Sequence, residues 1–439
     1  MSLAHSRKLG PFLATMLVTG NMVGSGLFLL PTTLAGLGGI SVLTWLLAAI
    51  GALVIAAVFA RLGVLAPWAG GPYAFARVTM GRYFGFQTNY IYWISCWIGN
   101  VAVALAVTGY LQELLPSLKT PLSTAVMTSL VIWLLVLVNI VGPRLVGRVE
   151  AATILIGLAP IAVITAVGWF YFDPKIFMES WNVSGRPAVE AVPASLVLVF
   201  WAFTGLESAA VAAAVVDNPK RNLPIAVLAG VIIAALVYAL SCTVLMGIIP
   251  ARELAASTAP FALASNRLLG PGVATLIAFT TIAKASGTEG GWTLVTAATA
   301  KAAAEDDAFP RFFARTDRRG IPVQSLLFHG VLMTAAAFAT ISPTIGEQFD
   351  KLIDVSVVFS MICYAYSAYA LYRLRPEGSH RARFDRIIAV LAIGFSVWVI
   401  VASDPMLLLI SAIILATSIP LFPFYKGVAA PVPVLSEAE

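Results

Sequence analysis

Long apolar runs separated by short polar turns dominate the chain between residues 12 and 424. A run of about 20 mostly apolar residues is long enough to cross a bilayer as a helix. The loops between the runs are too short to fold alone, and the Pro/Ala-rich tail 425–439 is expected to be disordered. The pattern predicts twelve membrane-spanning helices, at 12–35, 40–60, 85–112, 122–141, 150–172, 193–216, 223–249, 272–298, 322–341, 350–371, 386–403 and 405–424.

Two of these runs are interrupted near their middle. The stretch "GNMVGSGLFLLP" (residues 20–31) places three glycines in the first run, and "FWAFTGLESAAV" (residues 200–211) places Thr204, Gly205 and Glu207 in the sixth. Irregular backbone at mid-membrane depth is tolerated only where it lines a cavity. Small residues also serve close helix packing, which is the alternative for a single break. Two breaks five helices apart are instead typical of an inverted 5+5 repeat with a substrate site between broken helices.

The first interruption also has the features of an anion-binding site. Backbone N–H groups of Gly24–Ser25–Gly26 would stand at the N-terminus of a half-helix. Such a terminus carries unpaired donors and a positive partial charge, which suit a carboxylate.

Composition and charge support the membrane assignment. The 439-residue chain is 60% hydrophobic and 11% charged, with a mean hydropathy of +0.92, which excludes a soluble protein of this size. With the N-terminus in the cytoplasm, most of the 27 Lys and Arg residues fall in cytoplasmic loops, including the clusters at 311–319 and 373–386. This bias predicts that both termini are cytoplasmic, and it explains the net charge of +6 without a nucleic-acid partner. The start "MSLAHSRKLGPF" lacks a small-residue cleavage site, so the first helix is expected to be retained.

Several function classes lack the residues that they need. Cys96, Cys242 and Cys363 have no metal-ligand or paired spacing and are predicted to be free, buried thiols. No H-E-x-x-H motif, no base paired with a serine and no G-x-x-x-x-G-K-[ST] motif occurs. A channel would need rings of charge or carbonyls. The sequence therefore predicts neither an enzyme nor an ATP-driven pump, and no cofactor or metal.

Four stretches carry a resemblance to a known family. "GNMVGSGLFLLP", "GGPYAFARVTMGRYFGFQTNYIYWISCWIGNVA", "FWAFTGLESAAVAAAVVDNPKRNLPIA" and "GGWTLVTAATAKAAAEDDAFP" resemble the amino acid–polyamine–organocation superfamily. Within it, "YWISCWIGN", "FWAFTGLESA" and "GGWTL" are most similar to the basic amino acid/polyamine antiporters of the arginine/agmatine type. The similarity spans about residues 9–372 and fades over the last two helices.

The resemblance implies an architecture. It implies an all-α membrane protein of the LeuT type with twelve helices, of which the first and sixth are broken. A single transporter domain, 1–439, would contain inverted repeats at about 12–172 and 193–371 and two further helices at about 386–424. It also implies a homodimer formed through the last two helices. A bacterial inner membrane location is expected from the absence of a signal peptide.

The resemblance further implies roles for individual residues. Ser25 and Gly26 would hold the substrate carboxylate, backbone carbonyls near Met22 and Trp201 its amino group, and Trp292 would stack on a cationic tail through a cation–π contact. Phe86 stands where the family has a tyrosine of the cytoplasmic gate. The implied substrate-binding residues are Asn21, Met22, Ser25, Gly26, Ser95, Cys96, Asn100, Trp201, Gly205, Trp292 and Ser356. The implied gating residues are Tyr73, Phe86, Tyr92, Trp201, Glu207 and Tyr364.

Four charged residues fall inside predicted spans: Glu207, Lys284, Glu289 and Asp354. A charge facing lipid costs a few kcal/mol or more, so each should face a cavity or a partner. At 100° per residue, Lys284 and Glu289 lie about 140° apart, which disfavours a pair within the helix. Asp354 is the candidate partner for Lys284. Structural pairing, proton coupling and substrate contact all remain open for Lys284, and Glu207, Lys284 and Glu289 are the candidate coupling residues.

These features predict a secondary antiporter that exchanges a basic amino acid for its decarboxylated amine, most simply arginine for agmatine. A proton-coupled symporter of the same fold is the alternative, with Lys284 or Glu289 carrying the proton. An exchanger of neutral or anionic amino acids is a further alternative, since Lys284 at the site would repel a dication.

Overall fold

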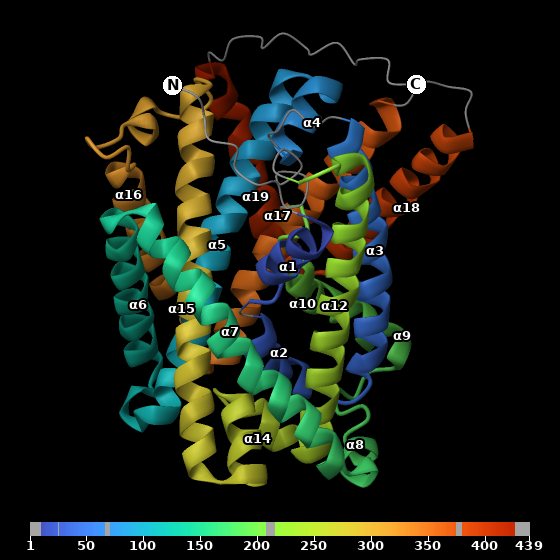
Figure 1. The fold of residues 1–439 in the computed structure, drawn as a ribbon, viewed down its shortest axis with the longest axis vertical. Coiled ribbons are helices and arrows are strands. Elements are labelled where there is room, and N and C mark those ends of the chain that lie inside the picture. Colours follow the sequence, from blue (N-terminus) through green and yellow to red (C-terminus); the bar gives the residue numbers. More distant parts are fainter. Residues whose placement is uncertain (1–9, 25, 66–70, 208–215, 375–379, 426–439) are drawn as a thin grey trace.

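A computed structural model describes residues 10–24, 26–65, 71–207, 216–374 and 380–425, and these ranges form one bundle of helices (Figure 1). Among the described residues, eight helices are long and apolar enough to cross a membrane: α3, α5, α6, α7, α12, α17, α18 and α19. The long helices are α3 (Ser41–Leu65), α5 (Arg82–Leu114), α6 (Pro121–Val141), α7 (Pro143–Gly168), α12 (Pro219–Ile248), α15 (Pro271–Glu305), α17 (Ile345–Leu374), α18 (His380–Ala402) and α19 (Pro405–Leu421).

Every apolar run expected from the sequence contains helix, although four differ from a simple span. The first, sixth and ninth runs consist of shorter helices. The eighth run, α15, is less apolar because threonines, Lys284 and Glu289 interrupt it. The shorter helices are α1 (Pro11–Met22), α2 (Gly26–Ala35), α4 (Gly71–Met80), α8 (Pro174–Glu179), α9 (Ala188–Ala194), α10 (Leu196–Phe200), α13 (Ala251–Ala255), α14 (Pro260–Leu269) and α16 (Val323–Ala339). The predicted disordered tail lies beyond the described residues, apart from Tyr425.

The first break separates α1 from α2. α1 ends at Met22, Val23 and Gly24 form a bend, and α2 begins at Gly26. Ser25 lies outside the described residues. The chain therefore leaves helical geometry within the glycine-rich stretch, as the pattern predicts.

The second break follows α10. A 3-10 turn, η3 (Trp201–Phe203), ends in extended backbone at Thr204. Gly205 then takes φ +99°, which only glycine adopts without steric cost. Residues 208–215 lie outside the described part of the chain.

The other helices pack around these two breaks. α15 packs against α5 and α7, α17 packs against α5 and α18, and α12 packs against α1 and α3. Figure 1 shows α4 at one end of the bundle and α8 and α14 at the other. The three cysteines are free and buried, as predicted.

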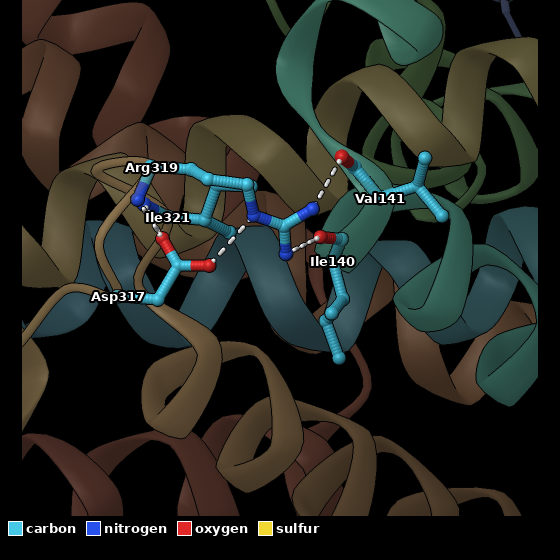
Figure 2. Close-up of polar contacts among 5 residues, drawn as sticks. All are labelled: Ile140, Val141, Asp317, Arg319 and Ile321. Carbon is cyan, nitrogen blue, oxygen red and sulfur yellow. Dashed lines mark hydrogen bonds and ion pairs between the residues drawn. The ribbon is translucent and has the colours of Figure 1, made fainter.

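The loop between α15 and α16 is tied to the end of α6 by one arginine, Arg319 (Figure 2). Its guanidinium donates to the carbonyls of Ile140 (3.0 Å) and Val141 (3.3 Å), which α6 leaves unpaired at its C-terminus. Asp317 accepts from the Arg319 Nε at 2.9 Å and from the backbone N–H of Ile321 at 2.9 Å. The Ile321 N–H, followed by the Arg319 side chain and N–H, holds the pKa of Asp317 below its usual value.

We expect Arg319→Ala to lower stability because two α6 carbonyls and the Asp317 carboxylate lose their donor. The site is exposed to solvent, which screens its charges, so the loss of stability should be small. The midpoint of thermal unfolding in detergent measures it. Arg315→Ala, in the same loop, is the matched control, and equal midpoints for the two variants would contradict the assigned role.

Candidate functional site

A small cavity lies between the two helix breaks. Its free volume is about 50 Å³, enough for a few water molecules. Glu207 is the only carboxylate among its described lining residues. The lining residues are Met22, Gly24 and Gly26 of the first break, Trp201, Thr204 and Glu207 of the second, Tyr92, Ser95, Cys96, Gly99, Asn100 and Val103 of α5, Thr288 and Trp292 of α15, and Ser356 and Ser360 of α17.

The indole of Trp201 crosses this cavity between two glycines. A Cβ on Gly26 would lie 3.2 Å from Trp201 Cδ1, and a Cβ on Gly99 would lie 2.8 Å from Trp201 Cη2. Gly99 therefore leaves the space that the ring occupies, and a side chain at position 26 would require the ring to shift by a few tenths of an ångström. Trp201 is attached to the break, so movement of that segment would carry the indole into or out of the cavity.

Glu207 joins the second break to two other helices. Its Oε1 accepts a hydrogen bond from Tyr92 of α5 at 3.0 Å. Its Oε2 accepts one from the Gly205 N–H at 3.0 Å and one from Tyr364 of α17. The side chain is 3% exposed. Three hydrogen-bond donors fix the position of this carboxylate. Glu207 therefore places one negatively charged group on the wall of the cavity.

The hydroxyl group of Tyr238, on α12, forms hydrogen bonds with backbone groups of the first break. Its hydroxyl donates to the Met22 carbonyl at 2.9 Å and accepts from the Gly24 N–H at 3.3 Å. The expectation that the Gly24 N–H would be free for a ligand is therefore wrong, because an aromatic hydroxyl from another helix takes it. Gly26, at the start of α2, still lines the cavity.

Hydroxyl groups on α5 and α17 bond to one another. Ser95 Oγ lies 2.9 Å from Ser356 Oγ and 3.0 Å from Ser360 Oγ, and it donates to the Ser356 carbonyl at 2.8 Å. Asn100 donates to Thr296 of α15 at 3.3 Å. These polar side chains fix the helix contacts around the cavity and present hydroxyl groups to its interior.

Lys284 lies beside the cavity and contacts it through Thr288. The lysine is 1% exposed, and its Nζ donates to Thr288 Oγ1 at 2.6 Å. Thr288 lines the cavity and would lie 3.1 Å, at its Cγ2, from a Cβ on Gly24. On the other side, Gly157 of α7 leaves room for the lysine stem. Lys284 thus supports the residue that packs on the first break.

The other two candidate buried charges lie away from the cavity. Glu289 is fully buried, and neither of its carboxylate oxygens has a hydrogen-bond partner among the described residues. Asp354 lines a different cavity with Asp350 and Asp404. The predicted Asp354–Lys284 pair is wrong because Asp354 faces away from α15, on the side of α17 opposite to Ser356. No ion pair joins Lys284 to Glu289 in the described structure, as their helical spacing predicts.

The two residues predicted for the cytoplasmic gate both lie beside Tyr425. Tyr73 of α4 donates to Asp306 at 3.0 Å and accepts from Arg77 at 2.8 Å. Phe86 of α5 stacks on Tyr425, with ring centroids 5.6 Å apart. A hydroxyl at position 86 is therefore not needed to hold Tyr73 in place.

Most of the predicted substrate-binding residues line the cavity: Met22, Gly26, Ser95, Cys96, Asn100, Trp201, Trp292 and Ser356. Gly205 instead holds Glu207, and the Asn21 side chain and Ser25 lie outside what the structure describes. The prediction missed Gly99, Val103, Thr204, Thr288, Ser360 and Tyr238. Helical spacing could have found several of them, since Thr288 and Ser360 stand four residues from Trp292 and Ser356.

Comparison with known proteins agrees with this architecture. Residues 9–426 match the amino acid permease family. The putrescine transporter PotE of Escherichia coli (strain K12) is 35% identical over 417 residues, covering 94% of this chain and 95% of that protein. PotE of Haemophilus influenzae is 36% identical over 414 residues, with the same coverage. The cadaverine/lysine antiporter of E. coli (strain K12) is 35% identical over 391 residues, covering 88% and 87%.

The match covers nearly the whole chain, including both helix breaks and the helices that surround the cavity. Family membership implies a LeuT-like fold, and it identifies the molecule as a transporter of amino acids or amines and not as an enzyme. The chain is a multi-pass membrane protein that belongs to the amino acid permease family.

Proposed function

We propose that the protein is an antiporter that exchanges a basic amino acid for the diamine or related amine formed by its decarboxylation. The observation that most supports this proposal is the position of Glu207. It is the only carboxylate among the described residues that line the cavity, which lies between two broken helices and contains aromatic side chains. A negative group beside Trp201 and Trp292 suits an organic cation through charge and cation–π attraction. The names of the relatives, which concern putrescine, cadaverine and lysine, support the same class.

The two substrates share a cationic end and differ in one carboxylate. The cationic end would face Glu207 and Trp292, and the carboxylate of the amino acid would face Gly26 at the start of α2, where the helix terminus favours an anion. The cavity of about 50 Å³ is smaller than either substrate, so Trp201 must move for binding. Alternating access would then move α1–α2, the α10 segment and α17 around the ligand.

The same proposal includes features expected from the apolar pattern, the charge bias and the family resemblance. They are twelve spans in one domain, inverted repeats at about 12–172 and 193–371, both termini in the cytoplasm, and a homodimer. Tyr73, Phe86, Tyr92, Trp201, Glu207 and Tyr364 would act as gates. The excess of Lys and Arg in the loops assigned to the cytoplasm supports the orientation.

Exchange in proteoliposomes tests the proposal. Vesicles containing the purified protein would be loaded with putrescine, cadaverine, agmatine, ornithine, lysine, arginine, a neutral amino acid or nothing. Uptake of labelled amine should require a basic amino acid or an amine inside. The amino acid and amine that exchange fastest show whether the protein prefers arginine and agmatine or the diamines putrescine and cadaverine with their parent amino acids. Accumulation into empty vesicles driven only by a pH gradient would instead establish the symporter, and uptake of neutral or acidic amino acids alone would refute the substrate class.

The fit of Trp201 between two glycines gives a prediction for Gly99→Ala. The added methyl would lie 2.8 Å from Trp201 Cη2, so the indole must shift or the backbones must separate. We expect exchange to fall about fivefold, with the protein still folded. Initial uptake rates normalised to folded protein measure it. Gly147→Ala is the control, because the added methyl meets no neighbouring atom. If both variants transport at the wild-type rate, the close fit of Trp201 against Gly99 is not required for exchange.

A further inference from the structure

A second cavity of about 570 Å³ lies between α10, α17 and the turn that joins α18 to α19. Three aspartates line it: Asp350 and Asp354 on α17, and Asp404 before α19. Thr33 near the end of α2 donates to Asp350, and the turn that follows α2 is hydrogen-bonded to Ser180 and Trp181 just after α8. These contacts put the Asp350 end of α17 at the α8 end of the bundle, which Figure 1 shows opposite to α4. In the proposed orientation this is the extracellular side.

Among the described residues, Asp354 has one carboxylate oxygen without a partner, although the backbone N–H of Asp404 reaches the carboxylate. Its side chain is 4% exposed, and Oδ1 has no hydrogen-bond partner in the described part of the chain. The other two aspartates are engaged: Asp350 accepts from Thr33 at 2.9 Å, and Asp404 accepts from the Met406 and Leu407 N–H groups at the start of α19. A buried, unpaired carboxylate oxygen is costly. A ligand that donates hydrogen bonds would remove that cost.

The arrangement of the charges favours an organic ammonium ion. The described residues contain no group of three or more acidic, His or Cys side chains close enough to hold a metal ion. Asp350 and Asp354 are one helical turn apart, about 6 Å, and Asp404 comes from another element. Two cationic side chains, Arg186 and Lys351, also line the cavity. The ammonium group of Lys351 donates to Ser342 at 2.9 Å, so this lysine already has a hydrogen-bond partner. An elongated amine can donate hydrogen bonds to more than one of these carboxylates at once.

The cavity is connected to the moving parts of the central site. α17 presents Asp354 to this cavity and Ser356, two residues later, to the central one. α10 contributes Val197 and Leu198 here and leads directly into Trp201. α2 reaches Asp350 through Thr33 and lines the central cavity with Gly26. A ligand bound here would therefore contact α10 and α17 directly, and it would be linked to α2 through the hydrogen bond between Asp350 and Thr33.

We propose that this aspartate cavity is an outer binding site for the ammonium group of the transported amine, occupied before the amine enters the central cavity. The inference rests on the proposed function, because it assumes a cationic substrate and an extracellular position for the α8 end. Asp354 supplies the unpaired acceptor, and Asp350 and Asp404 supply further negative charge.

Binding of putrescine to the purified protein in nanodiscs, followed by calorimetry, tests the site directly. Wild type should bind two molecules per chain. Glu207→Gln should remove one binding event and Asp354→Asn the other. Asp350→Asn, which keeps an oxygen for Thr33, should weaken the same event as Asp354→Asn. Lysine and sodium in place of putrescine distinguish an amine site from one for a basic amino acid or an inorganic cation. Binding of sodium at this site with no amine binding would overturn the proposal.

Transport supplies the second measurement. For Asp354→Asn we expect the KM for external putrescine to rise about fivefold, with an unchanged maximal rate and an unchanged KM for internal substrate. Glu347→Gln is the matched control, because it removes a carboxylate from the exposed start of α17 without altering the cavity lining.

The outcomes separate this inference from the proposed function. If wild type exchanges amines, and Asp354→Asn is indistinguishable from Glu347→Gln in both binding and KM, the outer site is wrong and the antiporter stands. If wild type neither binds nor exchanges any cationic amine, the proposed function fails and the outer site fails with it.

Discussion

Replacing Glu207 with glutamine should reduce amine exchange by about 100-fold or more while leaving the protein folded. Glutamine has the same shape and can still accept the Gly205 N–H and bond to the tyrosine hydroxyls, so the break should persist. The negative charge, however, is lost from a site that is 3% exposed. Removing one partner of a buried charged contact costs about 2–5 kcal/mol, and 100-fold in rate corresponds to about 2.7 kcal/mol. Initial rates of labelled putrescine and lysine exchange measure the effect.

Two tyrosine variants separate the charge of Glu207 from its hydrogen bonds. Tyr92→Phe and Tyr364→Phe each remove one donor to the carboxylate and keep its charge. We expect each to lower exchange by about tenfold, near the lower end of the about 1.5–3 kcal/mol that a hydrogen bond to a charged group contributes, because the carboxylate keeps its charge and its two other donors. Glu190→Gln, an exposed carboxylate in α9, controls for an overall change of charge. Near-normal exchange by Glu207→Gln would show that substrate charge is recognised elsewhere.

The sequence predicted the helices and both breaks because these depend on local properties. Apolar runs of sufficient length predict helices at membrane depth, and glycines predict where the backbone departs from them. Gly205 at φ +99° is an example in which residue type and conformation agree directly. The predicted lining residues on α5, such as Ser95 and Asn100, came from family resemblance and do face the cavity.

The contacts between helices could not be predicted in the same way. Tyr238 lies on α12, more than 200 residues from Gly24, and nothing in its own segment indicates that it caps the first break. The partner proposed for Lys284 was wrong for the same reason. Asp354 was assigned correctly to the face of α17 opposite to Ser356, but a helical angle alone does not say which helix lies on that side. The aspartate cavity exists because three separate segments meet there.

Lys284→Met should give a stable protein whose exchange is slower by about tenfold and no longer depends on pH. The ammonium of Lys284 is 1% exposed, donates to Thr288 and has no carboxylate within 4 Å among the described residues. Replacing such a buried charge by an apolar side chain of similar length is often neutral or stabilising. Thr288, in contrast, loses a donor beside Gly24, where the first break must move.

The alternatives for Lys284 give different results in one pair of measurements: the thermal unfolding midpoint, and exchange rates across pH 5–8. A structural role predicts a lower midpoint and an unchanged pH profile per folded molecule. A coupling role predicts an unchanged or higher midpoint and a flat pH profile, because the group that takes up the proton is gone. Lys301→Met, on the same helix but partly exposed and paired with Glu305 at 3.0 Å, is the matched control. A destabilised Lys284→Met protein that keeps the wild-type pH profile would assign the lysine to packing alone. The pH dependence that remained would then have to come from other groups, and of the two other buried candidates, Glu207 and Glu289, only Glu207 is among the described residues that line the cavity.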